Sequence, residues 1–181
     1  MIMHVFKKNK IAAALILSAG LSPLLAAAPA SAQGIGVTAG VGDHYQRLEI
    51  NWQSPALWDY QFGGNWGRLE LVGELGAAYW KANGSRDPGN VWQFNAIPMF
   101  RWWTGERFYL EAGVGATAFT STRFADKNIS TAFQFGDHIG AGFLINDSNR
   151  IGLRLSHFSN ASIKKPNPGL DVVQLTYTYL Y

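Results

Sequence analysis

The chain has 181 residues, of which 48% are hydrophobic, 14% aromatic and only 15% charged, against about 25% charged residues in an average soluble domain. The absence of cysteine excludes a disulfide framework, a thiolate metal site and a cysteine nucleophile. The net charge of +3 gives no support for nucleic-acid binding: three of the 15 Lys and Arg lie in the first 32 residues, which leaves 12 against 12 Asp and Glu.

Residues 1–32 form a predicted secretory signal peptide. Three lysines precede an apolar run over 11–27, and Ala30-Ser31-Ala32 matches the A-x-A cleavage pattern, so Gln33 is the expected first mature residue. A retained transmembrane helix is the alternative, but Pro23 interrupts the apolar run and the small-residue site ends it. The lysine-rich start is typical of bacterial export.

The mature chain, 33–181, alternates apolar and polar residues with a period of two, which indicates strands. In the last segment Val173, Leu175 and Tyr177 share one face, with polar residues between them. Many segments have about ten residues, the length of a tilted transmembrane strand. From the third strand onward short and long connections alternate, as periplasmic turns and extracellular loops do. The predicted strands are 35–42, 45–53, 66–80, 91–103, 106–117, 133–146, 150–159 and 171–181.

Each predicted strand has one apolar face and one face of polar or small residues. The polar faces carry charges of both signs, as an interior ion-pair network does, and Trp and Tyr flank the apolar faces, as they do at membrane interfaces. An eight-stranded barrel is just wide enough to be filled by its own side chains. We therefore predict an all-β fold, an eight-stranded antiparallel transmembrane β-barrel with a polar, side-chain-filled interior. The alternative is a secreted lipocalin-like barrel with its apolar face inward. The charged residues of the polar faces are Arg47, Glu49, Arg68, Glu70, Glu74, Arg101, Glu111 and Arg154.

One group of polar residues departs from this pattern. Continuing the apolar face of the seventh strand puts His157 and Ser159 on that face, and counting back along the eighth strand puts Asp171 on it too. The two strands are antiparallel neighbours, so the three residues converge on the lipid-facing side, at the end with the long loops. A charge on that face is costly, although less so near the interface, which favours a use for these residues.

These residue types are the parts of an activated-nucleophile hydrolase. Residues two apart on one face of a strand have Cα atoms ~6.6–6.8 Å apart, which lets an imidazole lean onto a hydroxyl. Ser159 is the predicted nucleophile, His157 the base and Asp171 the acid that fixes the imidazole. Asn160 could offer an amide donor to an oxyanion, and Asp137 is a weaker alternative acid on the sixth strand. The alternative to a catalytic site is a set of polar residues at the water interface.

The same segment resembles the signature of the PagL-type lipid A 3-O-deacylases. The resemblance implies an outer-membrane serine esterase that hydrolyses the acyl ester at the 3 position of lipid A, with His157 and Ser159 as the catalytic pair and Asn160 at the oxyanion. Two positions depart from the family: its acid is often Glu where this chain has Asp171, and Ser162 stands where Gly is common, with an oxyanion donor expected from its backbone. The matching residues are His157-Phe158-Ser159-Asn160-Ala161, Lys164-Lys165-Pro166-Asn167 and Gly169-Leu170-Asp171, with further matches over 137–142 and 111–115.

The resemblance also implies a bacterial outer-membrane location, where lipid A of lipopolysaccharide reaches the site laterally among the membrane lipids. The implied mechanism needs no metal or cofactor, and no nucleic-acid partner is expected. Two other functions stay open: a non-catalytic structural or adhesive barrel that acts through its loops, and a lipid acyltransferase barrel, which would need an acyl-sized pocket. The sequence specifies neither the acyl-chain length nor whether the barrel forms a homo-oligomer.

Overall fold

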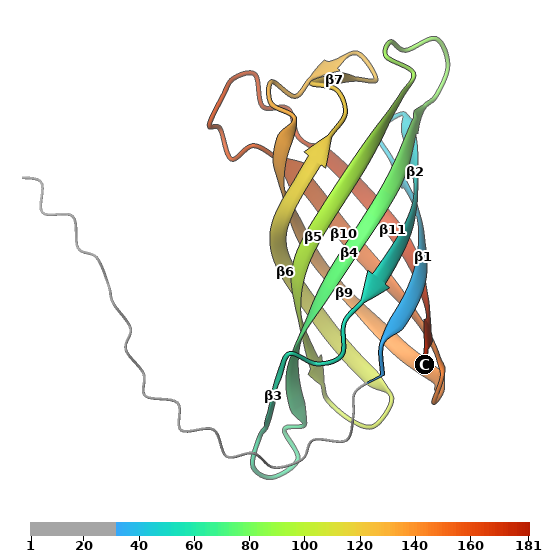
Figure 1. Cartoon of the computed structure of the whole chain (residues 1–181), viewed down its shortest axis with the longest axis vertical. Helices are drawn as coiled ribbons and strands as arrows, with labels where there is room; N and C mark the ends of the chain where they lie inside the picture. The colour runs from blue at the N-terminus through green and yellow to red at the C-terminus, as the bar shows by residue number, and fades with distance from the viewer. Residues whose placement is uncertain (1–31) are drawn as a thin grey trace, which may run out of the picture.

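The computed structural model describes residues 32–181, so the predicted signal peptide, 1–32, lies outside the described residues except for Ala32. Eight long strands form a closed, tilted antiparallel barrel (Figure 1), which confirms the predicted fold, and each predicted strand has its counterpart with ends within two residues. Three short strands in the connections were not predicted. The long strands are β1 (Gly34–Gly42), β2 (Tyr45–Gln53), β4 (Arg68–Ala82), β5 (Asn90–Trp103), β6 (Phe108–Phe119), β9 (Phe133–Asn146), β10 (Asn149–Ser159) and β11 (Leu170–Leu180), and the short ones are β3 (Trp58–Gln61), β7 (Arg123–Phe124) and β8 (Lys127–Asn128).

The barrel closes by pairing its first strand with its last. The long strands follow the order β2-β1-β11-β10-β9-β6-β5-β4, and β4 pairs back onto β2. The β1–β11 seam runs from Gly34↔Leu180 to Gly42↔Val172. β3 pairs with the first residues of β4, where β2 has already ended. A closed barrel leaves no unpaired edge among its main strands, which a bilayer requires.

From β4 onward the connections at the two ends of the barrel differ in length, whereas the two earlier ones, 43–44 at the upper end and 54–67 at the lower end, do not follow this division. The turns 104–107 and 147–148 lie at the lower end in Figure 1, near the C-terminus, and the connections 83–89, 120–132 and 160–169 lie at the upper end. Extracellular loops of membrane barrels are long and periplasmic turns are short, so the upper end is the extracellular one. β10 therefore runs outward, and its last residues lie at the extracellular rim.

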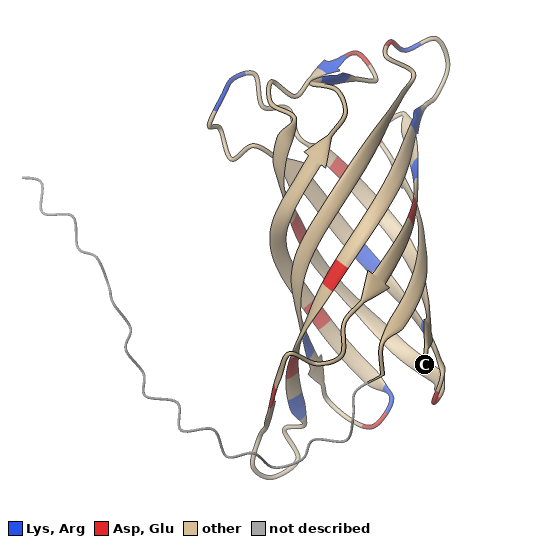
Figure 2. Ribbon diagram, viewed as in Figure 1, with Lys and Arg blue, Asp and Glu red and all other residues tan. Residues whose placement is uncertain are grey.

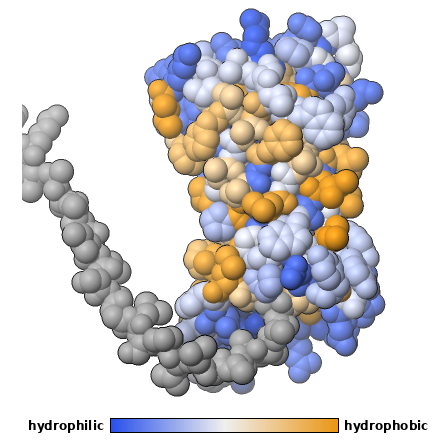
Figure 3. Space-filling model, viewed as in Figure 1, coloured by the Kyte–Doolittle hydropathy of each residue, from blue (hydrophilic) through white to orange (hydrophobic). Residues whose placement is uncertain are grey.

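Aliphatic side chains face away from the barrel. Ile50, Ile139 and Leu175 are 65%, 62% and 69% exposed, and apolar residues gather across the middle of the visible face (Figure 3). Leaving one such side chain in water costs about 1.5–3 kcal/mol relative to burying it, so this surface requires a lipid environment. The lipocalin-like alternative needs the apolar face inside and is wrong. Residues 32–181 include no helix long and apolar enough to cross a membrane.

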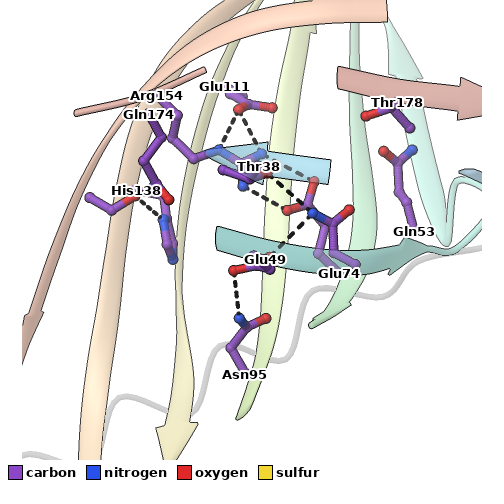
Figure 4. Close-up of polar contacts among 12 residues, drawn as sticks. Thr38, Glu49, Gln53, Glu74, Asn95, Glu111, His138, Arg154, Gln174 and Thr178 are labelled. Atoms are coloured by element: carbon purple, nitrogen blue, oxygen red, sulfur yellow. Dashed lines mark hydrogen bonds and ion pairs between the residues drawn. The ribbon is translucent and has the colours of Figure 1, made fainter. Parts of the chain in front are cut away.

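The middle of the barrel interior is filled by ion pairs, as predicted. Arg101 and Arg154 each contact both Glu74 and Glu111, with N–O distances between 2.6 and 3.1 Å. Figure 4 shows Arg154 among these carboxylates, which come from different strands. Arg47, Glu49 and Arg150 are buried in the interior as well, and most of the remaining charged residues lie toward the two ends of the barrel (Figure 2). The network therefore ties opposite walls of the barrel together.

Nearer the extracellular end the interior is apolar, which the alternation did not predict. Trp80, Phe119, Phe124 and Phe158 contact one another with ring centroids between 5.4 and 6.2 Å apart, and none is more than 4% exposed. We call these four residues the aromatic plug. It fills the barrel directly behind the outer ends of β10 and β11.

Candidate active site

His157 and Asp171 face each other across the last hairpin. β10 and β11 pair in the register His157↔Asp171, and the imidazole Nδ1 lies 2.6 Å from the carboxylate Oδ1. Their side chains are 44% and 79% exposed. This contact places the imidazole proton on Nδ1 and leaves Nε2 for a second partner.

Ser159 is the last residue of β10, two positions beyond His157 and on the same face. It pairs with Phe135 of β9 and is 8% exposed. Among the described residues, the imidazole of His157 has a hydrogen bond to Asp171 and none to the Ser159 hydroxyl. Hydrogen bonds between a nucleophile and its base are often long in free enzymes and tighten when substrate binds, so this arrangement is compatible with such a pair.

The chain turns sharply after Ser159. The N–H of Ile163 donates to the carbonyl of Asn160 at 2.9 Å, and the two residues between them, Ala161 and Ser162, have φ angles of 51° and 62°. Positive φ at both central residues is the mark of a type I′ turn. Within residues 32–181, nothing accepts a hydrogen bond from the N–H groups of Ala161 and Ser162. Two backbone donors are therefore available beside Ser159.

The side chain of Asn160 is engaged inside the loops. Its Nδ2 donates to the carbonyls of Ile129 at 3.1 Å and Lys164 at 2.9 Å, and the residue is 1% exposed. Its backbone N–H donates to Oδ1 of Asn167 at 3.1 Å. The amide donor that we expected for an oxyanion is therefore already used, and Asn160 instead joins the 160–169 connection to the 120–132 connection.

Gly169 packs against the imidazole of His157. Its φ is +67°, and a Cβ at this position would lie 2.5 Å from Cε1 of the ring. A side chain is thus disfavoured both by the backbone conformation and by the space. The sequence placed Gly169 in a motif but did not give this reason for it. The glycine lets the 160–169 connection confine the imidazole from the loop side.

An apolar groove of about 680 Å³ lies on the outer wall beside His157 and Asp171. Asp137 also borders it and pairs with His157 from β9, on the side opposite Asp171. The imidazole thus has a carboxylate on each neighbouring strand, and its hydrogen bond goes to Asp171. The described residues hold no group of three or more His, Cys, Asp or Glu that could bind a metal ion. The apolar lining of the groove is Val41, Ala112, Val114, Ile139, Leu155 and Val173.

Comparisons with known proteins agree on one family. The family model described as lipid A 3-O-deacylase (PagL) matches residues 44–180. The lipid A deacylase PagL of Bordetella bronchiseptica is 64% identical over 183 residues, covering 99% of this chain and 100% of that protein. The protein of the same name from Pseudomonas aeruginosa is 33% identical and covers 82% of this chain and 87% of its own length.

The fold comparison points the same way. The crystal structure of the outer-membrane enzyme PagL matches with a TM-score of 0.68 at 26% identity, covering 81% of this chain and 98% of that one. The present barrel is likewise an outer-membrane barrel. Because the family model spans most of the chain and a relative matches it along nearly its whole length, the chain belongs to the lipid A 3-O-deacylase (PagL) family.

Proposed function

We propose that this chain is a serine esterase that hydrolyses the 3-O-linked acyl chain of lipid A, with Ser159, His157 and Asp171 as its catalytic triad. The observation that carries the proposal is the 2.6 Å contact between His157 and Asp171 on the outer wall, where ionisable groups are costly. Ser159 follows on the same face of β10. The relatives named lipid A deacylase support the substrate class.

The reaction follows from the roles these groups can take. The Oγ of Ser159 attacks the ester carbonyl while Nε2 of His157 accepts its proton, and Asp171 orients the imidazole and stabilises its protonated form. His157 then gives the proton to the departing sugar oxygen, which leaves an acyl group on Ser159. Water, deprotonated by the same imidazole, hydrolyses that ester, releases the fatty acid and restores the serine.

The negative charge on the carbonyl oxygen requires donors close to Ser159. We assign this role to the backbone N–H of Ser162, with that of Ala161 beside it, since neither has a partner among residues 32–181. Asn160 contributes by holding the turn that presents them. One donor of this kind stabilises a transition state by about 2.7–4 kcal/mol.

The substrate reaches this site from the side. The triad lies at the extracellular rim of the outer wall, next to the apolar groove, so lipid A in the outer leaflet can meet it without entering the barrel. The groove suits the acyl chain because most of its lining is aliphatic, and Asp137 and Asp171 border it. The ester would then lie beside the hydroxyl of Ser159 while the acyl chain stays in apolar surroundings.

Mass spectrometry of lipid A from cells that express either the wild type or Ser159→Ala tests the proposal. We expect the wild type alone to remove one 3-hydroxyacyl mass. Ser156→Ala is a matched control: Ser156 lies on the same strand and contacts a histidine, His138, at 2.7 Å, but both are buried in the barrel interior. This variant should stay active. Deacylation by Ser159→Ala would contradict the proposal.

The other functions predict different results. A structural or adhesive barrel predicts that substitutions at His157 and Ser159 are silent and that exchange of the extracellular loops abolishes function. An acyltransferase predicts that the acyl chain appears on a second lipid, so the released product is analysed as well. Ion pairs and the aromatic plug occupy the interior that an acyl-sized pocket would need, which favours hydrolysis with release of free fatty acid.

A further inference from the structure

The hydroxyl of Tyr45 bonds to both backbone groups of Asp171. It accepts a hydrogen bond from the N–H of Asp171 at 3.0 Å and donates one to its carbonyl at 3.1 Å. Tyr45 is the first residue of β2 and is 1% exposed, so it reaches β11 through the barrel interior. The contact joins positions 126 residues apart, and neither the alternation nor the motifs predicted it.

The contact completes the sheet where β1 has ended. β1 pairs with β11 as far as Gly42↔Val172, and the chain then turns through Asp43 and His44 into β2. Asp171 is the next residue along β11, so on that side its N–H and C=O have no strand partner. Buried backbone groups without partners are costly, and the Tyr45 hydroxyl satisfies both.

Gly42 makes room for this arrangement. It pairs directly with Tyr45 across the first hairpin, and a Cβ at Gly42 would collide with the Tyr45 ring and with the carbonyl of Asp171. The ring therefore lies over the glycine and extends toward β11. Trp80 and Phe124 of the aromatic plug hold it there, with centroid distances of 5.5 and 5.6 Å.

We propose that Tyr45 is a positioning residue: it fixes the backbone of Asp171 from inside the barrel, so that the carboxylate outside stays at Nδ1 of His157. The inference rests on the triad proposed above. The Asp171 carboxylate is 79% exposed, and among residues 32–181 its side chain bonds only to His157. Its direction therefore depends on the backbone that carries it. Tyr45 itself is buried and touches neither lipid nor the reacting atoms.

Tyr45→Phe tests this, because it keeps the ring and removes only the hydroxyl. The purified full chain is assayed in detergent micelles with lipid A, and the released 3-hydroxy fatty acid is measured. We expect kcat to fall about 10- to 100-fold, since a displacement on the order of 1 Å away from the chemistry can cost about 100-fold. KM should not change, because the hydroxyl lies inside the barrel. A wild-type kcat would overturn the inference.

A double-mutant cycle separates positioning from general destabilisation. If Tyr45 acts through Asp171, then Tyr45→Phe has no further effect in the Asp171→Asn background, because the two residues act as a unit. The double variant should match Asp171→Asn alone. If Tyr45→Phe lowers kcat by the same factor in both backgrounds, Tyr45 does not act through Asp171 and the inference fails.

Tyr109→Phe is the matched control. Tyr109 is also 1% exposed and lies over a glycine, Gly142, at the opposite end of the barrel, so its variant should keep the wild-type kcat. If Tyr45→Phe does not refold, Gly42→Ala puts a methyl group against both the Tyr45 ring and the carbonyl of Asp171, which separates the two. It should lower kcat at unchanged KM, and a wild-type kcat would count against the inference. Full activity of Ser159→Ala would instead overturn the proposed function, whatever Tyr45→Phe does.

Discussion

His157 and Asp171 are directly opposed in the last hairpin, and the backbone groups of Asp171 bond to Tyr45 rather than to β10. The two residues therefore form a non-hydrogen-bonded pair, in which opposite Cα atoms are only about 4.5 Å apart. This short separation explains how the side chain of an aspartate reaches Nδ1 of His157.

This geometry predicts the effects of substituting the two carboxylates that flank His157, Asp171 and Asp137. Asp171→Asn should lower kcat by about 10³- to 10⁴-fold, the cost of losing the charge that orients a catalytic imidazole. Asp171→Glu should lower kcat less, because it keeps the negative charge and its side chain is longer by only one methylene. Asp137→Asn should stay close to wild type, since Asp137 has no hydrogen bond to His157 in the described residues. Steady-state release of fatty acid measures all three, and equal losses for Asp137→Asn and Asp171→Asn would refute the assignment.

At the scale of structural elements, the 160–169 connection, which follows Ser159, is held in place by the 120–132 connection. The side chain of Asn160 bonds to Ile129 of the 120–132 connection, and the hydroxyl of Ser130 donates to the carbonyl of Pro166 at 2.6 Å. Ile129 is 1% exposed and packs with the aromatic plug. The 160–169 connection is therefore anchored to the interior of the barrel through a second loop.

Asn160→Ala should loosen this connection. It leaves two carbonyls without their donor, at about 1–3 kcal/mol each, so amide hydrogen exchange over 161–169 should speed up. Activity should fall about 100-fold, as for loss of one oxyanion donor, because the N–H of Ser162 is no longer held in place. Ser130→Ala, which removes the other bond between the loops, should have a smaller effect. Lost activity with unchanged exchange would mean that the Asn160 amide acts on the oxyanion directly.

Across the whole molecule, the face of the strands that carries apolar side chains changes along the barrel axis. In the membrane-spanning part, aliphatic residues face out and charges face in, as Leu153 and Arg154 do on β10. At the extracellular rim of the same strand Phe158 faces in, while His157 lies on the outer surface. The rim lies at the edge of the apolar wall, where an outward polar group costs less than at its middle, and the interior behind these groups is filled by the aromatic plug.

The ion-pair network should carry much of the stability of the membrane-spanning part. Arg101→Met removes one of the two arginines that pair with the buried carboxylates of Glu74 and Glu111, so that Arg154 must pair with both. Breaking buried pairs of this kind costs about 3–5 kcal/mol of stability. Arg86→Met is the control, because the side chains of Arg86 and its partner Asp126 are 30% and 64% exposed, and an exposed pair of this kind is worth about 0–1 kcal/mol. Urea unfolding in detergent micelles, followed by tryptophan fluorescence, compares the two. Equal losses would show that burial of the pairs does not set their contribution.

Alternation with a period of two predicted the eight strands because each is long enough to show it, whereas β3, β7 and β8 have two to four residues. The same parity placed His157 and Asp171 on one face. It could not predict the role of Gly169, which depends on how a loop folds back. Nor could it predict the contact of Tyr45, which depends on the closure of the barrel. The loop contacts of Asn160 could not be predicted either, because its partner, Ile129, belongs to a loop that shows no periodicity.

The closing seam has a consequence for how the protein matures. Tyr45 belongs to the first hairpin and Asp171 to the last, and β1 and β11 meet only when the cylinder is complete. A chain in transit carries the serine, histidine and aspartate on one hairpin, but the aspartate is not yet anchored. If Tyr45 positions Asp171 as proposed, closure of the barrel is the step that fixes the aspartate, and the site is complete only when the first and last strands have paired.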